Sequence, residues 1–203
     1  MAAIGDVETL RALYGHPNPR SAKKVLTALD QHCRRFIELS PFTVLSSTGP
    51  DGLGDITPRG GEPGFVTIVD DATLLLPDRP GNNRIDTLVN ILGNPGVGLL
   101  FLIPGVDETL RVQGTAEILD DTDVCHRFAV GERAPKTVLR ITVREAYLHC
   151  AKAFMRSRLW DPAARIDRAA LPSMGEMLKD QLALATRGET QAEMIERYKE
   201  TLY

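Results

Sequence analysis

The chain has 203 residues, of which 43% are hydrophobic and 25% are charged, and its formal net charge at pH 7 is −3. This length favours one domain with terminal extensions. A chain of this length can bury a core without disulfide bonds or metal ions to stabilise it. Lysine and arginine are spread along the chain and leave no basic excess for nucleic acid. No apolar run approaches the roughly 20 residues of a membrane span, and residues 1–15 lack the pattern of a secretory signal. We therefore expect neither nucleic acid nor a membrane among the partners.

The cysteines and histidines give no sign of a metal site or of a disulfide framework. Cys33, Cys125 and Cys150 are odd in number and lie far apart, which argues against zinc ligation and disulfide staples. The histidines lack metal-ligand spacing. We expect no bound metal and a reducing, cytoplasmic compartment.

The N-terminal part reads as helical. A short helix is expected over 7–15, and the prolines that follow it disfavour continuation. Ser21 is the expected N-cap of a longer helix over 22–39, because Val25, Leu29 and Cys33 recur at helical spacing. The pattern predicts an N-terminal helical segment over residues 1–40.

From residue 42 onward the helical pattern gives way to strand patterns that are separated by turns. Strands are expected at 42–48, 65–69, 73–77, 97–103, 109–119 and 136–150, with helices at 83–92 and 120–130. Residues 55–64 look irregular, and the apolar run at 97–103 suggests burial on both faces. Most connections are hairpins rather than a regular βαβ alternation, which predicts a mainly β protein with α-helices, built as an antiparallel barrel.

Beyond residue 150 the pattern becomes helical and polar. Two surface or partner-facing helices are expected over 173–185 and 191–203. We therefore divide the chain into the helical segment 1–40, a barrel domain over 41–165 and a C-terminal helical extension over 166–203.

The most informative stretch is LPDRPGNNR, residues 76–84, which we call the anion loop. It follows an apolar strand and precedes a helix marked by Ile85, Leu88, Val89 and Leu92. A helix start presents free N–H groups and partial positive charge, and arginine adds planar charged donors, so this loop can seat a phosphate. The alternatives are that its arginines are solvated or pair with Asp78 or Asp86, and that Asn82 or Asn83 is a plain N-cap.

Three further segments concentrate unusual residues, each with a plainer interpretation beside the functional one. DITPRGG (55–61) sets an arginine in a glycine-rich turn where backbone can approach a ligand, but it also suits an ordinary loop. LIPG (102–105) suits a hairpin turn, and HCAKAFMRSRLW (149–160) suits a solvated amphipathic helix. P-loop, GxSxG and HExxH signatures are missing from the sequence, so no catalytic residue is assigned.

Five motifs in order give the sequence a resemblance. They are TPRG (57–60), LPDRPGNNR (76–84), FLIPG (101–105), LRVQGTAEI (110–118) and HCAKAFMRSRLW (149–160). Together, over roughly residues 30–165, the chain resembles the pyridoxamine 5′-phosphate oxidase-like, FMN-binding split-barrel superfamily, and within it a bacterial subgroup. The resemblance implies a six-stranded antiparallel split β-barrel with flanking helices that forms a homodimer and binds FMN at the subunit interface.

The resemblance also implies cofactor-binding residues. Arg79, Asn83 and Arg84 would hold the FMN phosphate, and Thr57, Pro58 and Arg59 would contact the flavin ring or ribityl chain. A C-terminal arm carrying Lys152, Arg156, Ser157 and Trp160 would reach the partner's flavin. The phosphate-binding lysine pattern and the C-terminal substrate motif of true pyridoxamine 5′-phosphate oxidases are not evident, which argues against vitamin B6 oxidation.

The leading hypothesis is an FMN-dependent oxidoreductase that transfers hydride to or from a small organic substrate. NADH or NADPH would act as a transient electron donor, since the sequence has no GxGxxG fingerprint. The alternatives are a non-enzymatic flavin- or haem-binding module on the same scaffold and a deazaflavin (F420)-dependent reductase. A dimeric scaffold that binds only adventitious anions also remains open.

Overall fold

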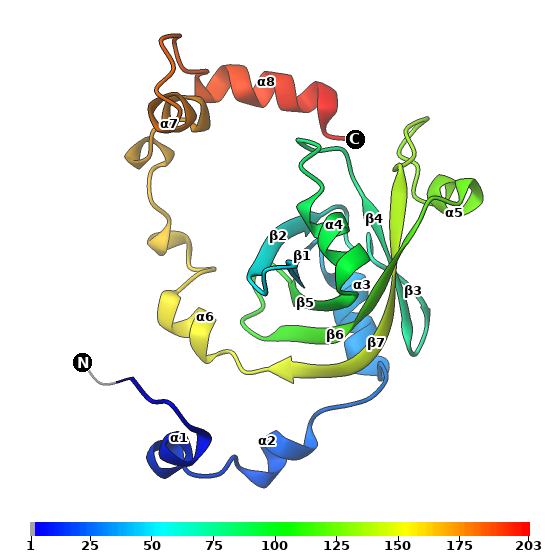
Figure 1. Cartoon of the computed structure of the whole chain (residues 1–203). Coiled ribbons are helices and arrows are strands. Elements are labelled where there is room, and N and C mark those ends of the chain that lie inside the picture. The colour runs from blue at the N-terminus through cyan, green and yellow to red at the C-terminus, as the bar shows by residue number, and fades with distance from the viewer. Residues whose placement is uncertain (1–2) are drawn as a thin grey trace.

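Alternating and continuous apolar runs build one antiparallel sheet. The computed structural model describes residues 3–203 (Figure 1). The strands are β1 Phe42–Thr48, β2 Gly54–Gly60, β3 Thr67–Asp70, β4 Thr73–Asp78, β5 Gly96–Leu102, β6 Thr109–Leu119 and β7 Thr137–His149. The helices are α1 Val7–Tyr14, α2 Pro19–Lys23, α3 Gln31–Leu39, α4 Asp86–Gly93, α5 Thr122–His126, α6 Lys152–Ser157, α7 Met174–Gln181 and α8 Gln191–Thr201. Across residues 3–203, no helix is long and apolar enough to cross a membrane.

The sheet confirms the mainly β, antiparallel split-barrel fold. Its order is β2-β1-β5-β6-β7-β4-β3, and it curls without pairing its two edge strands, as Figure 1 shows. In the described part of the chain it has seven strands rather than the expected six. The additional strand is β2, which looked irregular because of Pro58. Proline is tolerated there because β2 pairs only with β1 and lies at the edge of the sheet.

The core lies inside the curl of the sheet and under α3. Leu45, Phe101, Val112 and Ile141 are buried in one apolar cluster that also takes in Ile37 of α3. Burial alternates along β5, so this strand has one buried face rather than the expected two. Leu110, Val112 and Ala116 alternate along β6 and are buried, which fixes its register because a one-residue slip would turn them outward.

The long helix expected over 22–39 is wrong: the structure has two helices with a break between them. Leu26 forms a bridge to Ala146 of β7, with its N–H 2.9 Å from the Ala146 carbonyl oxygen. Asp30 then caps α3, accepting hydrogen bonds from the backbone N–H groups of His32 and Cys33. The pairing of Leu26 with the sheet and the Asp30 cap therefore override the helical pattern of the sequence. Val25, which belongs to that pattern, is exposed.

The cap gives the first testable prediction. Replacing Asp30 with alanine is expected to lower the free energy of unfolding by about 1 kcal/mol, because two N–H groups lose their acceptor. The hydrogen bond from the Cys33 N–H is the main cause that lowers the pKa of Asp30 below its ordinary 3.8. The stabilisation is therefore present at neutral pH and is lost as the pH falls below 3.8 through the folded-state pKa. Urea unfolding of wild type and variant, at pH 7 and at decreasing pH, should show the difference shrink, whereas exposed Asp120→Ala should stay near wild type.

Helix α4 forms where expected but presents a different face. Thr87, Asn90 and Ile91 are its buried residues, whereas Val89 and Leu92 are 52% and 79% exposed. The polar face is turned inward because the Asn90 amide donates to Ser47 Oγ at 3.0 Å and to Asp55 Oδ2 at 3.2 Å. These bonds satisfy buried polar groups and fix the rotation of α4 against β1 and β2.

Candidate functional site

A cleft of about 870 Å³ lies between the edge strand β2 and the anion loop. One wall is residues 55–60 of β2, and the opposite wall is the end of β4, the loop and the first turn of α4. Residues 132–137 and Tyr203 close the remaining side. Segments that are far apart in sequence therefore meet in this cleft, and they include residues for which the resemblance implied phosphate and ring contacts.

Arg59 and Asp78 form an ion pair across the cleft. Their side chains are only 17% and 22% exposed, so the pair is partly removed from water and is stronger than a surface pair. Arg59 Nε is buried and has no hydrogen-bond partner among the described residues. A buried donor without an acceptor costs free energy, and a ligand oxygen or an ordered water would satisfy it.

Arg79 is anchored beside this pair. Its Nη1 donates to the Phe128 carbonyl oxygen at 2.7 Å, and its guanidinium carbon lies 5.3 Å from the centre of the Tyr203 ring. Burial lowers the pKa of Arg79 below its ordinary value, but an arginine stays charged at physiological pH. The remaining N–H groups of a fixed, partly desolvated guanidinium make a good anion donor.

The loop reaches α4 through two residues with left-handed backbone, Asn83 at φ 58° and Ile85 at φ 53°. Such φ values are uncommon for a β-branched residue and indicate a locally constrained backbone. Asn82 Oδ1 accepts from the Arg84 N–H at 3.0 Å, so Asn82 stabilises the loop. Among residues 3–203 no side chain caps α4, and its first N–H groups are free for a ligand.

Arg84 is an exposed member of the predicted phosphate ligands. Its side chain is 75% exposed, and its Nε lies 2.8 Å from Asp86 Oδ2. This is the local pairing that the sequence left open as an alternative, and an exposed pair of this kind is weak. Arg84 can turn toward an anion at small cost, but it contributes less than a buried arginine.

The structure brings the predicted residues of β2 and the anion loop together, because Thr57, Pro58, Arg59, Arg79, Asn83 and Arg84 all line this cleft. The other predicted group lies elsewhere. Lys152, Arg156 and Ser157 are exposed on α6, and Trp160 Nε1 donates to the Val106 carbonyl oxygen at 2.9 Å. None of these four residues lines the cleft of its own chain within the described structure.

Several residues of the cleft were not predicted from the sequence. Its described lining carries the cations Arg59, Arg79, Arg84, Arg133 and Lys136 and the carboxylates Asp55, Asp78, Asp86 and Glu132. The balance is close to neutral, so binding of an anion must rely on the directed donors of Arg59, Arg79 and α4 rather than on bulk charge. No sequence motif marked Arg133 or Tyr203, because tertiary packing brings them to the cleft.

A second hollow of about 830 Å³ lies on another part of the sheet and includes His149, Cys150 and Phe154. Burial is the first cause that lowers the pKa of His149, with Lys24 and Arg111 adding to it. In residues 3–203 no group of three or more histidine, cysteine and acidic side chains is arranged to hold a metal ion. The cleft at the anion loop therefore stands out, since it combines directed donors with a constrained loop.

The family model for pyridoxamine 5′-phosphate oxidase matches residues 29–150, more than half of the chain. The chain belongs to the pyridoxamine 5′-phosphate oxidase family. The matched residues hold the whole sheet and both walls of the cleft. Membership in this family supports a flavin or a related nucleotide as the type of ligand.

Among solved structures, the chain matches proteins of low sequence identity over part of its length. Group A Streptococcus HupZ is 20% identical over 58% of this chain and 91% of its own, with a TM-score of 0.48. A putative pyridoxamine 5′-phosphate oxidase from Lactobacillus delbrueckii is 19% identical over 60% of this chain and 95% of its own, with a TM-score of 0.48. An F420 reductase is 20% identical over 57% of this chain and 94% of its own, with a TM-score of 0.42. No curated protein sequence matches the chain closely.

Proposed function

We propose that this protein is an FMN-dependent oxidoreductase that acts on a small organic substrate. The observation that carries the proposal is the meeting of Arg59, Arg79 and the uncapped start of α4 around one cleft of about 870 Å³. Family membership supports a flavin-type ligand for that cleft. The dianionic phosphate of FMN suits a helix start flanked by arginines.

The residues present fit the cofactor. Arg79 and the free N–H groups of α4 would hold the phosphate, with Asn83 shaping the loop and Arg84 adding an adjustable charge. Thr57 and Pro58 would lie against the ribityl chain or the ring. The unpartnered Nε of Arg59, buried in the described structure, would gain an acceptor from the ligand, which removes the cost of leaving that donor unsatisfied.

The cofactor, when bound, supplies the two-electron redox chemistry, and the chain supplies binding, orientation and electrostatics. Arg59 would hold positive charge at the ring end of the cleft, and its pairing with Asp78 fixes the direction of its guanidinium. The buried face of α4, through Asn90 and Asp55, keeps the helix start aimed at the cleft. This arrangement needs no acid–base pair of its own, since the redox step would belong to the cofactor.

A homodimer would complete the site. Lys152, Arg156, Ser157 and Trp160 do not reach the cleft of their own chain, so as cofactor contacts they would have to come from the partner. NADH or NADPH would bind transiently over the flavin, and the free thiols of Cys33, Cys125 and Cys150 suit a reducing, cytoplasmic compartment.

The absorption spectrum of the purified protein tests the proposal. We expect the two visible bands of an oxidised flavin, after purification or after addition of FMN, and bleaching of the longer-wavelength band by NADH or NADPH under anaerobic conditions. A haem spectrum or a deazaflavin spectrum would assign the cleft to another cofactor. A colourless protein that fails to bind added FMN would reject the proposal.

A further inference from the structure

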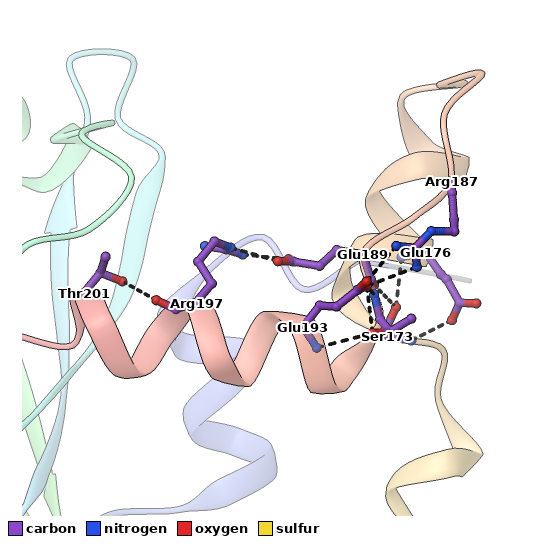
Figure 2. A network of polar contacts seen from close by, with 8 residues as sticks. Ser173, Glu176, Arg187, Glu189, Glu193, Arg197 and Thr201 are labelled. Atoms are coloured by element: carbon purple, nitrogen blue, oxygen red, sulfur yellow. Dashed lines mark hydrogen bonds and ion pairs between the residues drawn. The ribbon is translucent and has the colours of Figure 1, made fainter.

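Helices α7 and α8 form a pair, and the segment that joins them is bonded to the start of α7 and to α8, as Figure 2 shows. Arg197 binds Glu189 through Nη2 at 2.7 Å, and Arg187 binds Glu193 through Nη2 at 2.6 Å. Ser173 Oγ donates to the Glu189 carbonyl oxygen at 2.6 Å. Capping boxes close the start of each helix, so both helices begin at fixed positions on either side of the segment that joins them.

Close backbone packing adds to these contacts. A Cβ atom on Gly175 would lie 2.4 Å from both the backbone N and the backbone O of Glu189, and one on Gly188 would lie 2.9 Å from the Cα of Glu176. Only glycine fits at such distances. The start of α7 and the segment that leads into α8 are therefore packed backbone against backbone, and α8 runs from there to Tyr203.

That end lies on the cleft. In Figure 1 the C end of the chain lies beside the anion loop, and Tyr203 is part of the lining. Arg133 Nη1 donates to the backbone oxygens of Glu200 at 3.0 Å and Tyr203 at 2.7 Å. These bonds tie the last turn of α8 to the 132–137 loop and leave the Tyr203 ring over the Arg79 guanidinium.

The contact matters because Arg79 is also the best protected cation in the anion loop. An aromatic ring over a partly buried guanidinium is attractive and displaces water from it. It also restricts the rotation of a long side chain that would otherwise lose entropy when it binds an anion. Tyr203 thus covers one face of the Arg79 guanidinium, beside the proposed phosphate seat.

We propose that Tyr203 is a ligand-retaining cap, which the α7–α8 pair and Arg133 place over Arg79 so that it slows release of the phosphate-bearing cofactor. This inference rests on the proposed function, because it takes FMN as the ligand. It adds a binding residue outside the barrel and gives the C-terminal helices a role at the site. The ring, rather than the hydroxyl, carries the effect.

Stopped-flow release of FMN from the full-length protein tests the cap. Tyr203→Ala is expected to raise the dissociation rate constant roughly tenfold, which is the range of a partly desolvated cation–π contact. Tyr203→Phe keeps the ring and should stay near wild type. Tyr198→Ala is the matched control, since Tyr198 lies on α8 over Arg197 and away from the cleft, and it should also stay near wild type. Equal melting temperatures would show that the variants fold.

A second variant separates the cap from a simple loss of packing. Arg133→Gln removes the bonds that hold Tyr203 and should raise the rate in the same direction. The double variant Arg133→Gln/Tyr203→Ala should release FMN no faster than Tyr203→Ala, because both changes remove the same contact between the Tyr203 ring and Arg79. If wild type binds FMN but Tyr203→Ala matches Tyr198→Ala, or Tyr203→Phe matches Tyr203→Ala, the cap is wrong and the proposed function survives. A wild-type protein that binds no FMN overturns both.

Discussion

Replacing Arg79 with glutamine is expected to weaken FMN binding by about a hundredfold, close to 2.7 kcal/mol. A charge-assisted hydrogen bond from a partly buried donor is worth about 1.5–3 kcal/mol. Its loss also leaves the phosphate less well compensated in a cleft that is near neutral overall. Arg84→Gln should cost only about three- to tenfold, because that side chain is 75% exposed and already paired with Asp86.

The FMN affinities of wild type, Arg79→Gln and Arg84→Gln are compared by fluorescence titration of the ligand-free proteins at one fixed ionic strength. Arg140→Gln is the matched control, because Arg140 forms an exposed ion pair with Glu117 outside the cleft and should leave affinity unchanged. Arg79→Gln also removes a bond to the Phe128 carbonyl oxygen, so its melting temperature must be compared with that of wild type. A larger effect at Arg84 than at Arg79 would move the phosphate seat to the outer edge of the helix start.

The sequence predicted those parts of the site whose residues follow one another in a single segment of the chain. The strand, loop and helix around the anion loop are adjacent in sequence, and turn residues and helical spacing specify them directly. The TPRG segment was also found, although it was assigned to a loop rather than to β2. An edge strand that contains proline has a weak strand pattern, and its pairing with β1 supplies what the pattern lacks.

The predictions that were wrong concern tertiary contacts. The residues of 22–39 repeat as in a helix, yet the backbone of Leu26 pairs with Ala146, which is distant in sequence. In α4 the apolar stripe is largely exposed because Asn90 finds hydrogen-bond partners on β1 and β2. A prediction from periodicity places polar residues at the surface. It therefore cannot identify a buried helix face whose polar groups are hydrogen-bonded. Tyr203 was missed for the same reason, since only its contact with Arg79 marks it.

The strongest effect on stability is expected from Gly114→Ala, which should cost about 3 kcal/mol or more, at the upper end for overpacked sites. Gly114 lies on β6 where the register with β7 shifts, and it pairs with Val143. A Cβ atom there would lie 2.1 Å from the Thr142 carbonyl oxygen. That oxygen belongs to the backbone of a central strand, so it cannot move aside as a flexible side chain would.

The shift at Gly114 also shapes the sheet. Gln113 pairs with Glu145 and Gly114 with Val143, so Arg144 is the additional residue of a bulge. A bulge increases local twist, which lets a sheet curl. Beyond it, the first half of β7 pairs with β4, the strand that leads into the anion loop. Crowding this point would therefore disturb both the core and the position of the cleft.

Chemical denaturation of Gly114→Ala tests this, with Gly54→Ala as the matched control. Gly54 is also a strand glycine, but the described structure places nothing within 4 Å of a Cβ atom there. Gly54→Ala should be neutral or slightly stabilising, by about 0.4–1 kcal/mol, because it reduces the entropy of the unfolded chain. Equal stability of the two variants would mean that β6 and β7 can separate at the bulge, and the register shift would then be no constraint on the curl that aims β4 and the anion loop at the cleft.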